Sequence, residues 1–262
     1  MSEAKARPSL LRRIGVGLAT LVLVLLVAGF SACALLSKPR PDGETGPRAD
    51  ALARSIETVI NKEAWARTGA VRWYFGGRNR HVWDRTRMLS RVEWGGDKRV
   101  LLNLTTKNGL AFVGDKQVSG SQEQKLLAKA YAHWINDSFW LNPLVKLFDD
   151  GVERKLVQEP DGTQALLITY GGGGLTPGDA YLWLLDGNGR PRAWRMWVSI
   201  LPIKGIESSW AGWIALPTGA WVASEHRTPL FPLRLSDIAG ASTLAELEPG
   251  ADPFAALVQS GR

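Results

Sequence analysis

The side chains that most often carry out chemistry are few and scattered in this sequence. Its three histidines, His81, His133 and His226, lie far apart along the chain, and neither an HExxH motif nor a second cysteine accompanies them. A zinc site needs about four His, Cys or carboxylate ligands brought together, often as closely spaced pairs. The sequence therefore predicts no metal site and no cofactor, and it favours structural or surface roles for the three imidazoles.

Motifs for nucleophilic or phosphate chemistry are also missing. The sequence has no GxSxG, the motif that places a serine nucleophile on a sharp turn. Residues 171–174 are all glycine, but no Gly-Lys-Ser/Thr follows, so we interpret this run as a flexible connection between strands. Asp149 and Asp150 precede Gly151, which is typical of a turn. We expect no catalytic residue, and a hydrolase or lyase of unrecognised type is the least favoured interpretation.

The charge balance argues against nucleic acid as a partner. The chain carries a formal net charge of +7. Residues 1–33 contribute +3 of this charge, which leaves +4 on the 28 basic and 24 acidic residues in the rest of the chain. A nucleic-acid-binding surface usually shows as a run or stripe of Lys and Arg, which this sequence lacks. We interpret the surplus as a mixed, solvated surface.

The N-terminus has the pattern of a targeting or membrane segment. Arg12 and Arg13 precede 23 uncharged residues, 14–36. In one interpretation the sequence Phe-Ser-Ala-Cys ending at Cys33 resembles a bacterial lipobox, so that Cys33 is the site of lipid attachment. In the other, the 23 residues span a bilayer as an uncleaved helix. We favour lipidation because Cys33 is the only cysteine, which also excludes an intramolecular disulfide. Both interpretations place the bulk of the chain in the bacterial cell envelope, outside the cytoplasm and tied to a membrane.

These signals divide the chain into four parts. Residues 1–33 are expected to form a signal peptide or membrane anchor, and residues 34–49 a flexible linker rich in proline and glycine. Residues 50–240 are expected to form one globular domain, since a chain with 45% hydrophobic residues can bury a full core. Residues 241–262 contain two prolines and are expected to form a peripheral tail.

The globular domain has the pattern of an antiparallel meander interrupted by helices. The spacing of apolar residues predicts an amphipathic helix over 49–68 and a second helix that starts near Ser121 and breaks at 136–138. Most other segments alternate in the manner of strands, and Asn108-Gly109 predicts a hairpin. We expect an α+β, mainly antiparallel fold of about ten to eleven strands, too wide to stay flat.

The twelve tryptophans are unusually many, and most lie in predicted strands. Strands select large aromatic side chains for core packing, so burial is the first explanation. Trp194 and Trp197, however, are three residues apart on one strand and must point to opposite faces. Apolar side chains on both faces predict a sheet with helices on one side and a hydrophobic concavity or a membrane-facing rim on the other.

The order of these elements resembles the LolA/LolB-like superfamily of lipoprotein carriers and related uncharacterised bacterial lipoproteins. The resemblance rests on an N-terminal helix, a meander, a helical insert, and a D-x-x-G-x-P-x-x-W step at Asp186, Gly189, Pro191 and Trp194. The insert NDSFWLNPLVKLFDDG is similar to a segment of some of those uncharacterised proteins. The resemblance covers about residues 50–238 as an order of elements.

This resemblance implies a curved, unclosed β-barrel with a helical lid over an apolar cavity that receives acyl chains. The insert, residues 136–151, would be the lid that covers the cavity when no ligand is present. Exposing a concave apolar surface to water would otherwise cost about 25 cal/mol per Å². The candidate cavity-lining or lid residues are Trp73, Phe75, Trp94, Phe139, Trp140, Leu144, Phe148, Trp183, Trp197 and Trp210.

Two functions follow from this description. The first is a membrane-tethered envelope lipoprotein that binds hydrophobic ligands such as lipid or lipoprotein acyl chains. The alternative is an envelope scaffold or sensor domain that binds another protein and no small molecule. A continuous cavity lined by strand tryptophans favours the first function, whereas a solidly packed interior favours the second.

Overall fold

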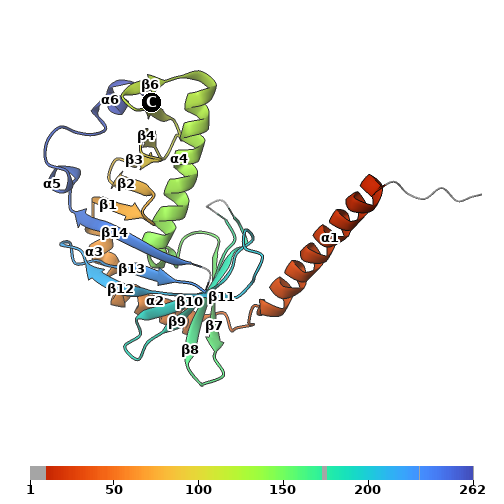
Figure 1. The fold of residues 1–262 in the computed structure, drawn as a ribbon. Coiled ribbons are helices and arrows are strands. Elements are labelled where there is room, and N and C mark those ends of the chain that lie inside the picture. Colours follow the sequence, from red (N-terminus) through yellow and green to blue (C-terminus); the bar gives the residue numbers. More distant parts are fainter. Residues whose placement is uncertain (1–9, 173–175, 230, 262) are drawn as a thin grey trace, which may run out of the picture.

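The computed structural model describes residues 10–172, 176–229 and 231–261, and it has an α+β fold (Figure 1). The helices are α1 (Leu10–Leu36), α2 (Pro47–Val59), α3 (Lys62–Arg67), α4 (Gly120–Leu141), the 3-10 helix η1 (Pro143–Lys146), α5 (Leu244–Leu247) and α6 (Ala255–Gln259). The strands are β1 (Ala70–Phe75), β2 (Asn79–Asp84), β3 (Leu89–Trp94), β4 (Lys98–Asn103), β5 (Gly109–Val113), β6 (Lys116–Val118), β7 (Val152–Gln158), β8 (Gln164–Tyr170), β9 (Ala180–Leu185), β10 (Pro191–Trp197), β11 (Ile206–Ser209), β12 (Ala211–Ala215), β13 (Trp221–Arg227) and β14 (Pro232–Ala241).

These strands form two antiparallel sheets. The nine-stranded sheet has the order β12-β13-β14-β1-β2-β3-β4-β5-β6, and the five-stranded sheet has the order β11-β10-β9-β8-β7. Within each run the neighbours are mostly consecutive in the chain, as expected for a meander. The one long-range pairing joins β1 to β14, so the last strand of the domain closes back on the first.

The two sheets meet at a corner formed by Trp210. β11 pairs with β10, whereas β12 begins at the residue after Trp210 and pairs with β13. The backbone N–H of Trp210 donates to the carbonyl of Arg192 at 2.8 Å, and Gly212 has a left-handed φ of 63°. A left-handed φ is easily adopted by glycine, which allows the chain to bend there. The strand surface therefore turns from one sheet into the other at this corner.

The α+β, mainly antiparallel fold class is confirmed, but the number of strands is not. The described residues contain fourteen strands, against the ten to eleven that we expected. Two apparent strands are each divided in the structure. Gly114, with φ of 58°, turns the chain between β5 and β6, and Trp210 separates β11 from β12. We expected each of these stretches to be one strand, although Gly114-Asp115 and Gly212 are residue types that often mark a turn or bend.

Helix α4 runs without a break to Leu141, so the expected interruption at 136–138 is wrong. Asn, Asp and Ser have low helix propensity because their side chains compete for backbone hydrogen bonds. Tertiary contacts override that preference here, because Asp137 is buried and bonded to the nine-stranded sheet. The helix is followed at once by Pro143, which starts the 3-10 turn η1.

Helix α4 covers the face of the nine-stranded sheet that we call the inner face. It packs along β3, β4 and β5, where its Leu126, Leu127 and Ala130 join a core cluster with Val92 and Val100 (Figure 1). Its C-terminal end and η1 then cross to the five-stranded sheet, whose β7 and β8 also contact α2. Two sheets and two helices therefore enclose one interior.

The segment expected to be a flexible linker is held against the domain at two points. The backbone N–H of Lys38 donates to the carbonyl of Lys204 at 2.9 Å, and Glu44 forms a two-way backbone bridge with Leu156. α2 begins at Pro47, and Ala49 is already buried. The composition of residues 34–49 favours extension, and the extended chain uses its free backbone groups to bond to the neighbouring strands.

The C-terminal tail contributes more than its expected peripheral role. Phe254 and Leu257 are fully buried, and they pack on Leu89, Leu101 and Leu110. These three leucines lie on the outer face of the nine-stranded sheet, opposite α4. A sheet with apolar residues on both faces must be shielded from water on both faces. Helix α4 shields the inner face, and the C-terminal tail shields this part of the outer face.

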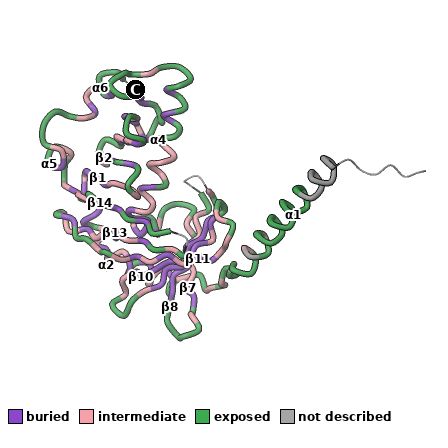
Figure 2. Tube along the Cα trace, viewed as in Figure 1, coloured by how far each residue is buried: buried purple, intermediate pink, exposed green. Residues whose placement is uncertain are grey.

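Helix α1 projects away from the domain and is exposed along its described length (Figures 1 and 2). The 19 residues Leu18–Leu36 are long and apolar enough to cross a membrane, and none of those whose burial is described is buried in the domain. A helix with this composition that finds no protein core is typical of a membrane span or a signal sequence.

Candidate functional site

The candidate site is a cluster of aromatic side chains on the inner face, where the strands of the five-stranded sheet bring together residues distant in sequence. Tyr181 and Trp183 are two apart on β9 and share a face, and Trp194 on β10 lies opposite Trp183 in register. The Trp183 and Trp194 ring centroids are 4.9 Å apart, and each ring is also 4.9 Å from Trp210 at the corner. With Tyr170, Phe139 and Trp140 these rings form what we call the aromatic interior.

The end of α4 and the turn after it lie directly on this cluster. We call residues 139–148 the cover segment. The Phe139 ring is 5.1 Å from Tyr181 and 5.9 Å from Trp194, while the Trp140 ring is 4.8 Å from Trp194. Phe139 and Trp140 are only partly buried, whereas Trp183 and Trp194 beneath them are fully buried. The cover segment therefore forms the outer layer of the aromatic interior.

The far end of the cover segment is fixed differently. Leu144 is fully buried in the same core cluster, but Phe148 is partly buried under two arginines. The guanidinium of Arg154 lies 4.4 Å from the Phe148 ring centroid, and that of Arg54 lies 4.6 Å from it. Cation–π contacts at a partly exposed site contribute about 0.5–1 kcal/mol each, so this end is held less firmly than Leu144.

The aromatic interior contains polar atoms without partners. Within the described part of the chain, the indole N–H groups of Trp183, Trp194 and Trp210 are buried and have no hydrogen-bond acceptor. Buried Trp N–H groups usually find an acceptor, and an edge-to-face aromatic contact replaces one only weakly. The indole N–H groups of four other core tryptophans, Trp73, Trp83, Trp94 and Trp134, share this state. At the aromatic interior three such donors lie on one apolar surface, where the acceptor oxygens of a bound group could pair with them.

Titratable groups in the aromatic interior are kept uncharged by burial. Burial raises the pKa of both Tyr170 and Tyr181 above their ordinary value. Burial also lowers the pKa of His226, whose ring is 4.4 Å from Trp210 and 5.2 Å from Trp140, to about 4, against a weak opposing effect from the Ser209 carbonyl. Removal from water disfavours the charged form in each case. The interior is therefore apolar and uncharged near neutral pH.

A second group of side chains, which we call the polar anchor, ties α4 to the sheet just before the cover segment. Asp137 is buried, and its Oδ2 lies 2.7 Å from the Nε2 of His81 and accepts a 2.7 Å hydrogen bond from the amide of Asn79. The imidazole of His81 stacks on Trp73 with centroids 4.4 Å apart. Burial lowers the pKa of the neighbouring His133, and the charge of Asp137 opposes that effect. Asn79 and His81 lie on β2 whereas His133 and Asp137 lie on α4, and no sequence motif links the two elements, so this cluster was not predicted.

Six of the ten expected lining residues meet at the aromatic interior. They are Phe139, Trp140, Leu144, Phe148, Trp183 and Trp210. Trp73 and Phe75 belong to a neighbouring core cluster under the middle of α4, and Trp94 belongs to a third cluster under its first half. The cluster of the aromatic interior contains none of these three described residues, although the cluster of Trp73 and Phe75 also contains Leu141 of the cover segment.

Trp197 is a correction to the expected lining. It packs against the cluster on the opposite face of the five-stranded sheet, and its indole N–H donates to the carbonyl of Lys38 at 2.8 Å. Strand alternation sends Trp194 to the inner face and Trp197 to the outer face.

Sequence reasoning missed four residues of the aromatic interior. They are Trp194, which contacts most of the other rings, and Tyr170, Tyr181 and His226. Alternation shows that Trp194 and Trp197 are separated, but which of the two points inward depends on where α4 packs.

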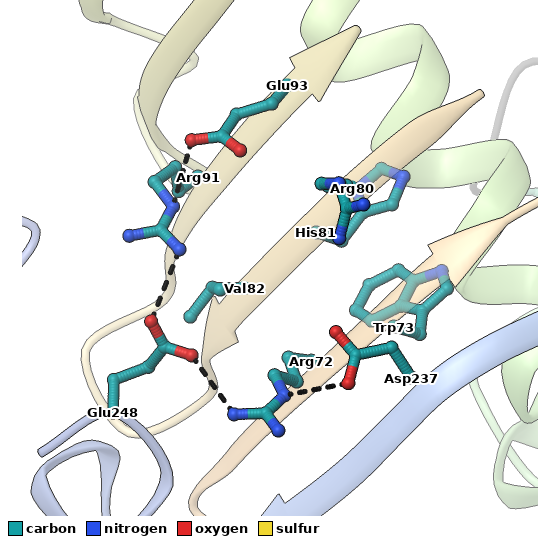
Figure 3. A pocket seen from close by; sticks show the side chains of 9 residues that line it. All are labelled: Arg72, Trp73, Arg80, His81, Val82, Arg91, Glu93, Asp237 and Glu248. Atoms are coloured by element: carbon teal, nitrogen blue, oxygen red, sulfur yellow. Dashed lines mark hydrogen bonds and ion pairs between the residues drawn. The ribbon is translucent and has the colours of Figure 1, made fainter. Parts of the chain in front are cut away.

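The apolar cavity expected beneath the lid is filled by side chains in this conformation. The two principal hollows of the described residues lie elsewhere. One, of about 130 Å³, is on the outer face of β1 to β3 and is lined mainly by charged side chains, among them Arg72, Arg80 and Glu248 (Figure 3). The other, of about 380 Å³, is an open hollow near Asp50 and Arg154. Neither of them opens into the aromatic interior.

The outer hollow is electrically balanced. Arg72 pairs with Asp237 and Glu248, and Arg91 pairs with Glu248 and Glu93, as the chain of contacts in Figure 3 shows. Exposed and half-exposed pairs of this kind contribute little net energy. The arrangement satisfies the charges of the outer face and does not present a surplus to an anionic ligand.

Comparison with known proteins adds no identification. No family model matches this chain, and no curated protein matches its sequence. The resemblance to the LolA/LolB-like proteins therefore stays a prediction, and the case for a function depends on the geometry described above.

Proposed function

We propose that this chain is a membrane-tethered protein of the bacterial envelope that binds a hydrophobic ligand, such as a lipid or lipoprotein acyl chain, in its aromatic interior. In this proposal the two sheets form a half-barrel that bends at Trp210, and the cover segment is its displaceable lid. The chain is attached through α1 or through a lipid on Cys33. The observation that carries the proposal is the layer of partly buried aromatic side chains over fully buried ones whose indole N–H groups lack acceptors.

The free energy lost when the cover segment is displaced and the free energy gained when an acyl chain is buried in its place are of similar size. Displacing the cover segment would remove six large apolar side chains from their contacts, which are Phe139, Trp140, Leu141, Leu144, Leu147 and Phe148. The cost is about 1.5–3 kcal/mol each, or about 9–18 kcal/mol together. Burying an acyl chain of about fifteen methylene groups would recover about 12 kcal/mol at about 0.8 kcal/mol per methylene. A long acyl chain therefore offsets the displacement of the cover segment, and a short one does not.

The unpaired indole N–H groups also restrict the chemical class of the ligand, because they need hydrogen-bond acceptors. An ester or amide carbonyl next to an acyl chain could accept from the indole N–H groups of Trp183, Trp194 or Trp210. A pure hydrocarbon would leave those donors unpaired, at a cost of about 1–3 kcal/mol for each. We therefore expect acylated ligands to bind more tightly than alkanes of the same length.

The test is photocrosslinking in the full-length protein. The chain is reconstituted in nanodiscs that contain a phospholipid with a photoreactive acyl chain, and the labelled peptides are mapped by mass spectrometry. The proposal expects labels on peptides from β9, β10 and the cover segment in addition to those on α1. Labels confined to α1 would contradict it, because α1 contacts lipid whether or not the interior binds a ligand.

A second candidate function is supported by one observation. The aromatic interior is packed solid, with Trp183 and Trp194 fully buried, which favours a scaffold or sensor domain that binds another protein and never opens. The same experiment separates the two functions, since a scaffold with a permanently filled interior would show no acyl label on β9 or β10.

A further inference from the structure

We infer that the connection between β10 and β11, residues 199–205, is a second membrane contact beside α1, and that its partner is the acyl region of the lipid bilayer. This inference rests on the proposed membrane attachment and adds a site to it. It concerns a loop of the folded domain, which the attachment itself does not require to touch lipid.

The loop is bonded to the chain at the point where that chain leaves the membrane segment. The Lys38 N–H donates to the Lys204 carbonyl at 2.9 Å, and the Lys204 N–H donates to the Ser37 hydroxyl at 3.0 Å. The indole N–H of Trp197, at the start of the loop, donates to the Lys38 carbonyl at 2.8 Å. Three hydrogen bonds therefore fix the loop beside the exit of α1.

The distance from the bilayer is short under both interpretations of the N-terminus. If α1 spans the membrane, Lys38 is the second residue after Leu36, which places it within roughly 7 Å of the end of the helix along an extended chain. If Cys33 carries the lipid instead, Lys38 is the fifth residue after Cys33, which places it at most about 18 Å away. Either way the loop is held at the membrane surface.

The loop presents apolar surface at this position. Ile200 is 74% exposed, more than the other exposed large hydrophobic residues that the structure describes outside α1. The neighbouring Pro202 is also exposed, while Leu201 and Ile203 turn inward and pack against the aromatic interior. An isolated exposed isoleucine is ordinary on a protein surface, but one that is fixed next to a membrane segment has a defined apolar partner.

The loop backbone is also suited to leaving water. The ammonium group of Lys204 donates to the carbonyls of Val198 and Leu201, at 2.6 and 2.9 Å. The N–H of Ser199 donates to the carboxylate of Asp179 at 2.8 Å. Unpaired backbone groups are what make a loop costly to transfer into lipid, and these bonds satisfy several of them within the protein.

A second apolar side chain lies toward the same edge. Phe231, in the connection between β13 and β14, is 44% exposed. β13 runs antiparallel to β12, and the N–H of Arg227 at its end donates to Ser209 at the end of β11. The chain after Arg227 therefore continues toward the start of β11, where the 199–205 loop ends. Leu201 and Ile203 connect this edge to the aromatic interior.

The test uses the full chain with one fluorescent label. Cys33→Ser removes the natural thiol and leaves α1 in place, and Ile200→Cys then accepts a nitrobenzoxadiazole label. The protein is reconstituted in vesicles of phosphatidylethanolamine and phosphatidylglycerol whose acyl chains carry a doxyl quencher. Val258→Cys is the matched control, since Val258 is 55% exposed and belongs to α6, which lies at the end of the domain remote from α1 (Figure 1).

The inference expects a blue-shifted label at position 200 and a several-fold larger loss of fluorescence to the quencher than at position 258. Equal, weak quenching at both positions in a chain that remains in the vesicles would overturn the loop contact and leave the membrane attachment standing. If neither these variants nor the chain with Cys33 intact incorporates into vesicles, the attachment is overturned, and the loop contact with it. Both variants replace exposed side chains, so folding can be checked by unchanged tryptophan emission.

Discussion

Helix α4 is held at two neighbouring places in opposite ways. At the polar anchor, Asp137 receives directed hydrogen bonds from Asn79 and Asn136 and lies 2.7 Å from His81. Two residues later, Phe139 begins a set of ring contacts with no hydrogen bond among them. Directed bonds specify one position for the helix, whereas apolar contacts can be replaced by any apolar group of similar volume.

This contrast shows how one helix can be both fixed and displaceable. The polar anchor keeps the body of α4 on the nine-stranded sheet, because separating the buried group from its partners would leave unpaired polar atoms. The cover segment, in contrast, is held mainly by apolar contacts that a ligand can restore, together with a 2.9 Å hydrogen bond from the Arg154 guanidinium to the Leu147 carbonyl near its far end. Movement would therefore begin after Asp137 and leave the first part of the helix in place.

The largest effect is expected for Trp194→Ala. Trp194 is fully buried and contacts Phe139, Trp140 and Trp183, so its removal should lower the free energy of unfolding by about 3–5 kcal/mol. Trp197→Ala, on the same strand but half-buried on the other face, should cost only about 1 kcal/mol. Denaturant unfolding followed by circular dichroism measures both. Equal decreases in the free energy of unfolding for the two variants would show that the aromatic interior contributes no more to stability than the opposite face of the strand.

The next largest effect is expected in the pH dependence of the free energy of unfolding, which should differ between the aromatic interior and the polar anchor. The unfolded chain takes up a proton on His226 near the ordinary pKa of 6.5, but in the folded protein the pKa is about 4. The free energy of unfolding should therefore be full above pH 6.5 and fall as the pH drops to 4, by at most about 1.4 kcal/mol per pH unit for this one group. His226→Gln should flatten that fall more than His133→Gln does, because Asp137 partly stabilises a charge on His133. Urea titrations at several pH values measure this fall in the free energy of unfolding. A larger flattening in His133→Gln than in His226→Gln would contradict the difference expected between the two histidines.

A smaller loss is expected at the polar anchor for Asp137→Asn. The amide keeps one acceptor but turns an N–H₂ group toward donors from Asn79, His81 or Asn136, which should cost about 1–3 kcal/mol. Asn136→Ala is the control, since Asn136 is exposed and its amide donates only to the outer oxygen of Asp137. Thermal unfolding of both variants checks this. If Asp137→Asn were as stable as Asn136→Ala, the anchor would not fix the helix.

The smallest expected effect sharpens the role of the cover segment. Phe139→Ala removes a side chain that competes with the ligand, so acyl photolabelling of β9 and β10 should rise by up to about tenfold, equivalent to about 1.4 kcal/mol. Phe75→Ala is the matched control, because Phe75 is also partly buried but packs in the neighbouring cluster. Unchanged or weaker labelling in Phe139→Ala would indicate that Phe139 belongs to a permanent core.

Sequence reasoning identified more of the elements than of their contacts. The Asn108-Gly109 hairpin and the mainly antiparallel class follow from local patterns, and the structure confirms them. The single helix expected over 49–68 is divided into α2 and α3, because Asn61 between them has a left-handed φ of 55°. The break expected at 136–138 failed because a buried hydrogen bond from Asp137 outweighs the low helix propensity of this stretch. The polar anchor could not be found, since its two halves, Asn79 and His81 on β2 and Asp137 on α4, are separated by more than fifty residues.

The sequence by itself determined where apolar surface must be buried: along one side of each helix, on both faces of the strand carrying Trp194 and Trp197, and in the uncharged N-terminal segment. Those patterns depend on residue periodicity and composition, which are local. Only the tertiary structure decided that Trp194 faces α4, that Asp137 meets His81, and that residues 139–148 fill the interior. These contacts depend on how the two sheets turn at Trp210 and on where α4 crosses them, and packing between distant segments fixes both.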